Sequence, residues 1–79
     1  MDERMMQQIN LDFLKSYEQL LSSSLQKNDT EYYLVNNDIR QFYRQWKGFF
    51  AHHGYFDVPI QSTIGIAACV AQKINKNSN

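Results

Sequence analysis

The chain has 79 residues with eight acidic and eight basic side chains, so its formal net charge at neutral pH is zero. This length predicts a single domain over residues 1–79, which the apolar periodicity described below predicts to be helical. Zero net charge provides no overall field toward nucleic acid or an anionic membrane, and the single cysteine, Cys69, rules out an internal disulfide.

No segment has the pattern of a membrane span or a signal peptide. The longest apolar run, residues 64–71, is too short to cross a bilayer. The N-terminal sequence MDERMMQQ lacks a basic region followed by an apolar stretch. We therefore expect a cytoplasmic protein without membrane contact. The charge is divided unevenly, because residues 1–31 carry six of the acids and residues 32–79 carry five of the bases.

The first predicted element is an amphipathic helix over residues 3–26. Its apolar side chains recur every three or four residues, as one face of a helix requires; they include Met6, Ile9, Phe13, Tyr17 and Leu20. Asp2 and Glu3 place negative charge at the start, where the helix dipole favours it. Leu11 lies off this stripe and is either partly exposed or a contact. Polar residues 26–29 indicate a turn.

The second predicted element is a helix over residues 30–53, centred on the aromatic segment 39–50. Steps of three and four residues connect its apolar positions, which are Tyr32, Val35, Ile39, Phe42, Trp46 and Phe49. Residues 31–35 are strand-like by propensity, so a short extended piece before the helix is the alternative. A lone strand would lack a pairing partner, which favours one helix, with a kink near Asn37 left open.

The third predicted element is a helix over residues 59–76. Gly54 is a natural terminator of the preceding helix. Asp57 is a candidate N-cap, and Ser62 or Thr63 offers a later start. The stripe expected to face the core is Ile60, Ile64, Ala67, Ala68, Ala71 and Ile74. Its small central residues would let the large rings of the second helix approach closely.

Three amphipathic helices joined by short turns predict an all-α fold, a small antiparallel three-helix bundle. A core of this size supplies only ~3–5 kcal/mol, so aromatic packing or a partner copy would reinforce it. The sequence leaves dimerisation open.

A basic row on one flank of the second helix is the main candidate for binding. Its basic side chains lie next to an aromatic ring. The row is either a solvated face, a contact for an acidic protein, or a contact for a phosphate backbone. Two further rings in the connection before Pro59 either plug the bundle or anchor a partner. The candidate partner-binding residues are Arg40, Tyr43, Arg44, Lys47, Tyr55 and Phe56.

A second apolar edge of the third helix is formed by Ile66, Cys69 and Val70. Either this helix is central and covered on both sides, or the edge is exposed and serves as a dimer or partner interface. The sequence favours neither of these two interpretations. Cys69 lies among small apolar residues, so we interpret it as an inert buried thiol rather than a nucleophile.

His52 and His53 invite a metal or proton-transfer role, but adjacent residues on a helix point about 100° apart and do not easily share one ion. One cysteine with two histidines also falls short of a closed zinc site. No serine or cysteine is spaced to work with a histidine, and no two carboxylates are paired. We expect no enzyme activity, no metal and no cofactor, with His53 in a structural role and His52 facing outward.

Surplus aromatic and apolar residues on a minimal domain predict a protein-interaction module. Such a module would be a regulator or inhibitor that acts by binding another protein, with a homodimer as one form. The alternative is a nucleic-acid-associated regulator that uses the basic row. Base reading by residues 63–73 is disfavoured, because Gln72 within that stretch and Gln61 just before it are the only suitable side chains.

Overall fold

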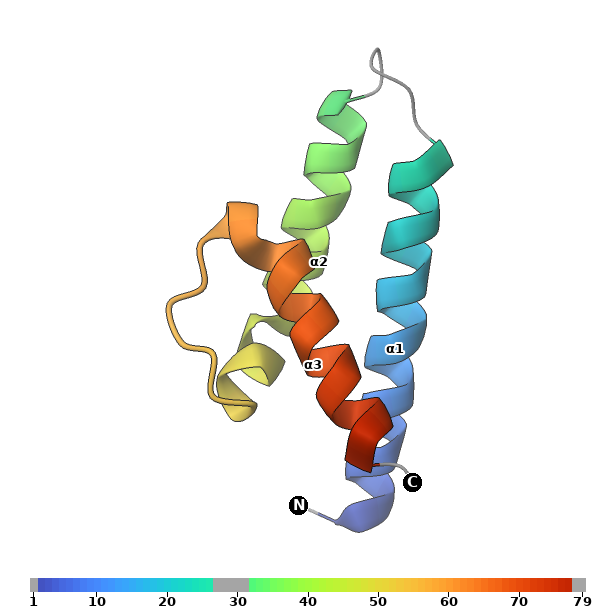
Figure 1. Ribbon diagram of the computed structural model, residues 1–79, viewed down its shortest axis with the longest axis vertical. Coiled ribbons are helices and arrows are strands. Elements are labelled where there is room, and N and C mark those ends of the chain that lie inside the picture. The colour runs from blue at the N-terminus through green and yellow to red at the C-terminus, as the bar shows by residue number, and fades with distance from the viewer. Residues whose placement is uncertain (1, 27–31, 78–79) are drawn as a thin grey trace.

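The computed structural model describes residues 2–26 and 32–77, which form three α-helices (Figure 1). Helix α1 spans Glu3–Gln26, α2 spans Tyr32–His52 and α3 spans Thr63–Asn77. A short 3-10 helix, η2, spans Ile60–Ser62 directly before α3. The all-α three-helix prediction is confirmed. The extended alternative for residues 31–35 is wrong from Tyr32 onward, and Thr30 and Glu31 lie outside the described residues.

Helix α1 begins at a side-chain cap. The Arg4 backbone N–H donates to Oδ1 of Asp2 at 3.0 Å, and the Met6 N–H donates to the Asp2 carbonyl oxygen at 3.0 Å. A capping aspartate satisfies a backbone donor that the helix itself leaves unpaired, which contributes ~1 kcal/mol. The cap fixes the end of α1 that lies nearest the C-terminal end of α3 (Figure 1).

The hydrophobic core is centred on the Phe13 ring of α1, which is completely buried. Its centroid lies 5.2 Å from that of Trp46, 5.1 Å from that of Phe49 and 5.7 Å from that of Phe42, all on α2. Aromatic pairs at these separations stabilise by ~0.5–1.5 kcal/mol beyond the area that they bury. Phe13 therefore joins α1 to most of the aromatic stripe of α2.

Helix α3 presents a different stripe to this core from the one expected. Ala67, Ala71 and Ile74 are buried as predicted, but Ala68 is exposed and Ile60 is 43% exposed. The buried line instead follows steps of four, three and four residues through Thr63, Ala67, Val70 and Ile74. Thr63 is tolerated there because its hydroxyl donates to the Ile60 carbonyl oxygen at 2.6 Å. The polar Thr63 is not part of the stripe predicted from apolar residues, so that stripe follows a different helical register.

The helices do not alternate in direction, so the antiparallel expectation is wrong for one pair. Helix α1 runs against α2 and α3, whereas α2 and α3 run in roughly the same direction (Figure 1). Ile60 borders a hollow with Arg40 of α2, and Lys73 reaches the carbonyl oxygen of His53 at the end of α2. The chain returns along residues 53–59, which we call the return segment. Seven such residues can span ~23 Å, far more than a tight turn.

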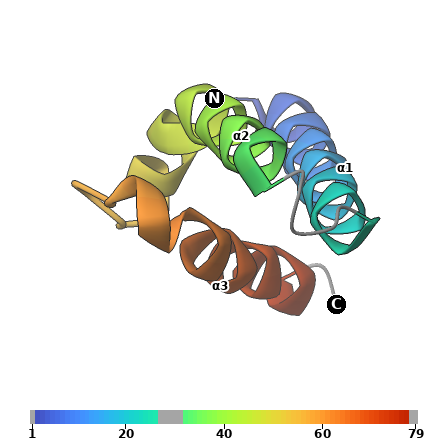
Figure 2. The ribbon, with the colours of Figure 1, turned by 90° about the horizontal axis from the view of Figure 1, so that it is seen from above.

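Helix α3 lies against one side of the α1–α2 pair (Figure 2). It has 15 residues, against 24 in α1 and 21 in α2, so it covers only part of their length. Figure 1 shows the end of α1 and the start of α2 extending beyond the start of α3. The α1–α2 pair therefore has one end covered by α3 and one end that α3 does not reach.

Candidate interaction surface

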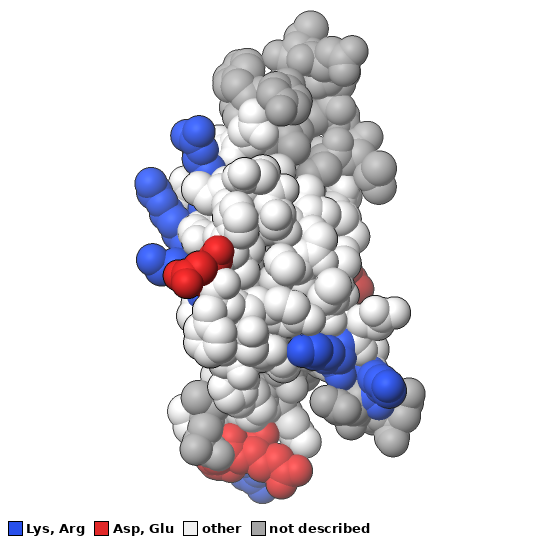
Figure 3. Space-filling model, turned by 60° about the vertical axis from the view of Figure 1, so that its left-hand side comes forward, with Lys and Arg blue, Asp and Glu red and all other residues white. Residues whose placement is uncertain are grey.

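The basic row lies on the exposed side of α2. Arg40, Arg44 and Lys47 are all exposed, and together with Tyr43 and Ile60 they line a hollow of about 340 Å³. Within residues 2–26 and 32–77, none of the three cations forms an ion pair or a side-chain hydrogen bond. Figure 3 shows Lys and Arg side chains gathered along one edge of this side of the molecule. These charges are thus available to a ligand.

An adjoining hollow of about 440 Å³ separates α2 from the return segment. Tyr43 and Lys47 line both hollows, so the two adjoin each other. Tyr55 and Phe56 of the return segment line the larger hollow, and Phe56 is 72% exposed. The structure therefore brings all six predicted partner-binding residues together. We call this surface the basic–aromatic face; it consists of Arg40, Tyr43, Arg44, Lys47, Tyr55, Phe56, Val58 and Ile60.

The return segment leaves α2 through a Schellman-type turn at Gly54. The Tyr55 N–H donates to the Phe50 carbonyl oxygen at 2.9 Å, and the Gly54 N–H donates to that of Ala51 at 2.9 Å. Gly54 has φ of +91°, in the left-handed region where a side chain would be strained. The terminator predicted at Gly54 is confirmed, and the turn directs Tyr55 back toward α2.

Lys73 of α3 holds the start of the return segment in place. Its ammonium donates to the His53 carbonyl oxygen at 3.2 Å and lies 4.5 Å from the centroid of the Tyr55 ring. A cation over an aromatic face at an exposed site contributes ~0.5–1 kcal/mol. We call this arrangement the Lys73 clasp. Sequence periodicity could not find it, because it depends on α3 ending beside the end of α2.

Asp57 does not cap α3. The residue before η2 is Pro59, where no side chain forms a cap hydrogen bond. Asp57 lies two residues earlier with φ of +55°, so its backbone turns the return segment instead. Its carboxylate lines the hollow that Lys47 also borders. One negative charge is therefore built into a surface that is otherwise basic.

The second apolar edge of α3 is mostly covered. Val70 is completely buried in the core, and Ile66 is half-buried against it. Cys69 is exposed, so the expectation of a buried thiol is wrong. At Val70 the interpretation of a covered central helix holds, because the side chain lies on the line that faces α1 and α2. The prediction that Val70 belongs to an exposed interface is therefore wrong. Roles of Ile66 and Cys69 in a dimer stay predictions.

His53 is half-buried beneath Phe49, with a centroid separation of 4.7 Å, and His52 is exposed, as expected. Nε2 of His53 is buried without a hydrogen-bond partner among the described residues. Burial lowers the pKa of His53, and the nearby charges of His52 and Lys73 lower it further. Among residues 2–26 and 32–77, no three His, Cys, Asp or Glu side chains are grouped to hold a metal ion.

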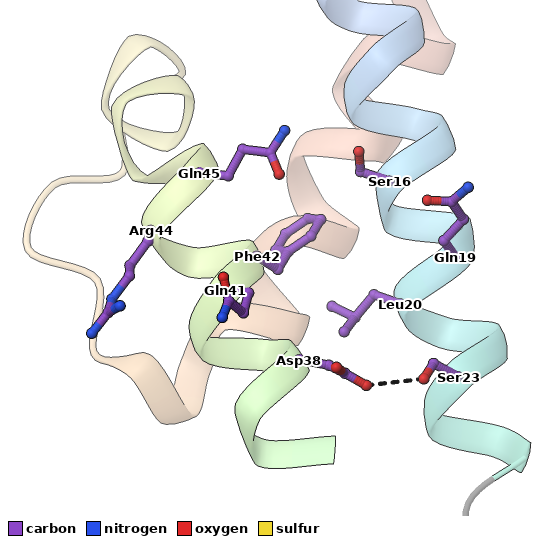
Figure 4. Close-up of a pocket in the computed structure, with 9 residues that line it drawn as sticks. All are labelled: Ser16, Gln19, Leu20, Ser23, Asp38, Gln41, Phe42, Arg44 and Gln45. Atoms are coloured by element: carbon purple, nitrogen blue, oxygen red, sulfur yellow. Dashed lines mark hydrogen bonds between the residues drawn. The ribbon is translucent and has the colours of Figure 1, made fainter. Parts of the chain in front are cut away.

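A polar groove between α1 and α2 was not predicted from the sequence (Figure 4). Its volume is about 570 Å³, and no described residue of α3 lines it. Leu20 and Phe42 are its apolar residues, and the Ser23 hydroxyl donates to Oδ2 of Asp38 at 3.0 Å across it. Figure 4 shows the Arg44 side chain directed away from α1. The remaining lining groups are uncharged: Ser16, Gln19, Gln41 and Gln45.

Comparison with protein-family models, curated proteins and solved structures finds no match for this chain. Within the described residues, none of the helices combines the length and the apolar character that crossing a bilayer requires. The basis for a functional proposal is therefore the geometry of the basic–aromatic face.

Proposed function

We propose that the protein is a helical protein-interaction module that binds another protein through its basic–aromatic face. It acts as a regulator or inhibitor by occupying a surface of that partner. One observation carries the proposal: Arg40, Arg44 and Lys47 are exposed and unpaired within the described residues, beside Phe56, which is 72% exposed. Arginine and aromatic side chains dominate the binding energy of protein interfaces.

The shape of the face supports this proposal. The two adjoining hollows measure about 340 and 440 Å³, within the ~300–1,000 Å³ range of ligand-binding pockets. Tyr43 and Val58 are half-buried in their walls, and Ile60 is exposed at the rim. A partner side chain can thus bury apolar surface here while charged groups contact the basic row.

Nucleic-acid binding through the same basic row is the less favoured function. Three cations would neutralise at most about three phosphates, and the affinity would then fall by about one log unit per phosphate for each log unit of salt. The negative charge of Asp57, which lines the larger hollow beside the face, opposes a polyanion. A homodimer remains a further prediction, since the partner could be a second copy.

Photo-crosslinking from the face tests the proposal. Phe56 is replaced by p-benzoylphenylalanine, and the protein is irradiated in a lysate of its host with and without nuclease. We expect a discrete protein adduct that resists nuclease and disappears when Arg40, Arg44 and Lys47 are all replaced by glutamate. Leu11 is the matched control position, because it is 61% exposed on α1 and lines neither hollow.

The outcomes separate the alternatives. Equal adducts from positions 11 and 56, or an adduct that survives the triple charge reversal, would contradict the proposal. An adduct that nuclease removes would favour the nucleic-acid function. An adduct with the mass of two chains would identify the partner as a second copy.

A further inference from the structure

The three cations of the basic–aromatic face form a line with helical spacing. Arg40, Arg44 and Lys47 follow one another at steps of four and three residues on α2. On an α-helix these steps keep the side chains on one face and spread them over ~10 Å of its axis. A ligand with negative charges at matching intervals could contact all three. A helix that carries acids at steps of three or four residues has that spacing.

A partly apolar hollow, the larger of the two, lies directly beside this line of charge. Tyr43 and Lys47 border both hollows, so any group bound in either hollow lies next to the cations. Phe56 lines the larger hollow and Ile60 lines the smaller one, and they are 72% and 43% exposed. The surface therefore combines a row of cations with neighbouring aromatic and exposed apolar side chains. This combination complements an amphipathic segment whose acidic and apolar side chains lie next to each other.

On this basis we infer that the occupant of the basic–aromatic face is an acidic amphipathic helix of the partner protein. Its carboxylates contact Arg40, Arg44 and Lys47, and a bulky aromatic or branched side chain on its adjoining apolar side enters the hollow. This inference rests on the proposed function and adds the chemical class of the bound segment. Binding of an amphipathic helix in a hydrophobic groove is a common mode of peptide recognition.

Charge complementarity favours this occupant over a nucleic acid. A helix can present carboxylates along one edge and still place an uncharged or basic side chain opposite Asp57. A phosphate backbone carries its charge at every residue, so it would bring negative charge against that carboxylate. The exposed apolar side chains of Phe56 and Ile60 also require an apolar counterpart. The acidic helix supplies both elements at once.

The face is held in shape before any ligand arrives. The Schellman-type turn at Gly54 and the Lys73 clasp fix the position of Tyr55, which is a wall of the larger hollow. A preformed site lowers the ordering cost of association. The described residues that line the hollows therefore already have their positions before the partner binds. Lys73→Met should weaken binding by loosening Tyr55, although Lys73 lines neither hollow.

Selection from a library tests the inference directly. A phage-displayed library of helix-forming peptides is selected on the wild-type protein and counter-selected on the variant with Arg40, Arg44 and Lys47 replaced by glutamate. We expect enriched peptides to carry acids at steps of three or four residues beside an aromatic or branched residue. With a labelled winning peptide, Arg44→Glu should raise the dissociation constant at least about tenfold.

Two controls make this result specific. Lys76→Glu has the same change of charge on an exposed lysine of α3 outside the face, and should change the dissociation constant less than about twofold. A peptide with lysines in place of its acids should bind the Arg44→Glu variant better than it binds the wild type. Circular dichroism of each variant confirms that the helices are retained.

Three results would overturn the inference. One is enrichment of peptides without acids, another is equal binding to the triple variant, and the third is no enrichment at all. Displacement of the peptide by a short oligonucleotide at lower concentration would favour a phosphate ligand. If the crosslink at Phe56 captures a protein while these peptides fail, only the helix inference fails. If the crosslink also fails, the proposed function fails with it.

Discussion

The two ends of the α1–α2 pair hold together by different means. At the end that α3 covers, the Phe13 ring lies 5.1–5.2 Å from the rings of Phe49 and Trp46. At the other end, the Ser23 hydroxyl donates to Asp38 across a polar groove that no described residue of α3 lines. The same two helices thus change from aromatic packing to hydrogen bonding where the third helix stops.

This difference has a simple physical origin. Two helices alone bury only a narrow strip between them, so aromatic rings placed beyond α3 would remain partly exposed to water. A third helix closes the site around Phe13 and removes it from water. The comparison teaches that stability in this fold is concentrated at one end, and substitutions can test that distribution.

Removing the central ring should have the largest effect. Phe13→Ala leaves a cavity among Phe42, Trp46 and Phe49, so we expect the free energy of unfolding to fall by ~3–5 kcal/mol. Urea denaturation followed by circular dichroism measures this. Leu11→Ala is the control and should change stability by less than ~0.5 kcal/mol, because Leu11 is 61% exposed. Equal losses would contradict a core centred on Phe13.

The turn at the covered end is the next most sensitive point. Gly54→Ala forces φ of +91° on a residue with a Cβ and should cost ~1–2 kcal/mol. Gly48→Ala on α2 is the matched control and should instead stabilise by up to ~1 kcal/mol. Both added methyl groups meet no atom within 4 Å, so any difference in unfolding free energy comes from backbone conformation.

The uncovered end should respond more weakly. Ser23→Ala removes the 3.0 Å hydrogen bond to Asp38 and should lower the unfolding free energy by ~0.5–1.5 kcal/mol. Hydrogen exchange should also be faster for amides near Ser23 than for amides near Phe13, since fewer apolar contacts protect them. Slower exchange near Ser23 would reverse the comparison between the ends.

Acid should weaken the covered end slightly through His53. Its pKa in the folded protein lies below the usual ~6.5, mainly because of burial, so the unfolded chain binds the proton more readily. The stability from a neutral His53 is fully present above pH ~6.5 and declines as the pH falls toward the folded pKa. Denaturation midpoints measured across this range should fall with a shallow slope. His53→Gln should abolish that slope, while His52→Gln should largely retain it.

The basic–aromatic face should contribute least to stability. Replacing Arg40, Arg44 and Lys47 together by glutamine should change the unfolding free energy by less than ~0.5 kcal/mol, because these exposed side chains form no ion pairs within the described residues. The same variant should lose the crosslink from Phe56. A large loss of stability would indicate that the row is structural rather than a binding site.

Local patterns predicted the local structure well. The bounds 3–26 and 30–53 lie close to those of α1 and α2, and Gly54 terminates α2 as expected. These features depend on residues close together in the chain, where periodicity and turn chemistry act. The basic row was also visible, because Arg40, Arg44 and Lys47 belong to one helix.

The errors arose where distant segments meet. The direction of α3 depends on the path of residues 53–59, which periodicity does not encode. A stripe defined by Ile60 and Ile64 leaves Val70 on a second edge, whereas the buried line runs through Thr63, whose hydroxyl is satisfied by the Ile60 carbonyl oxygen. The groove beside Ser23 and the clasp at Lys73 likewise depend on how the helices pack, so the sequence pattern does not reveal them.

The common direction of α2 and α3 has an electrostatic consequence. Two helices that run the same way bring their partial negative C-terminal charges to one end of the molecule (Figure 1). Helix α1 runs the other way, so its positive N-terminal end lies at that same end. Lys73, held at the His53 carbonyl oxygen, adds a full positive charge between the two C-termini. This arrangement offsets the repulsion between the parallel helix dipoles, which an alternating bundle would not have to balance.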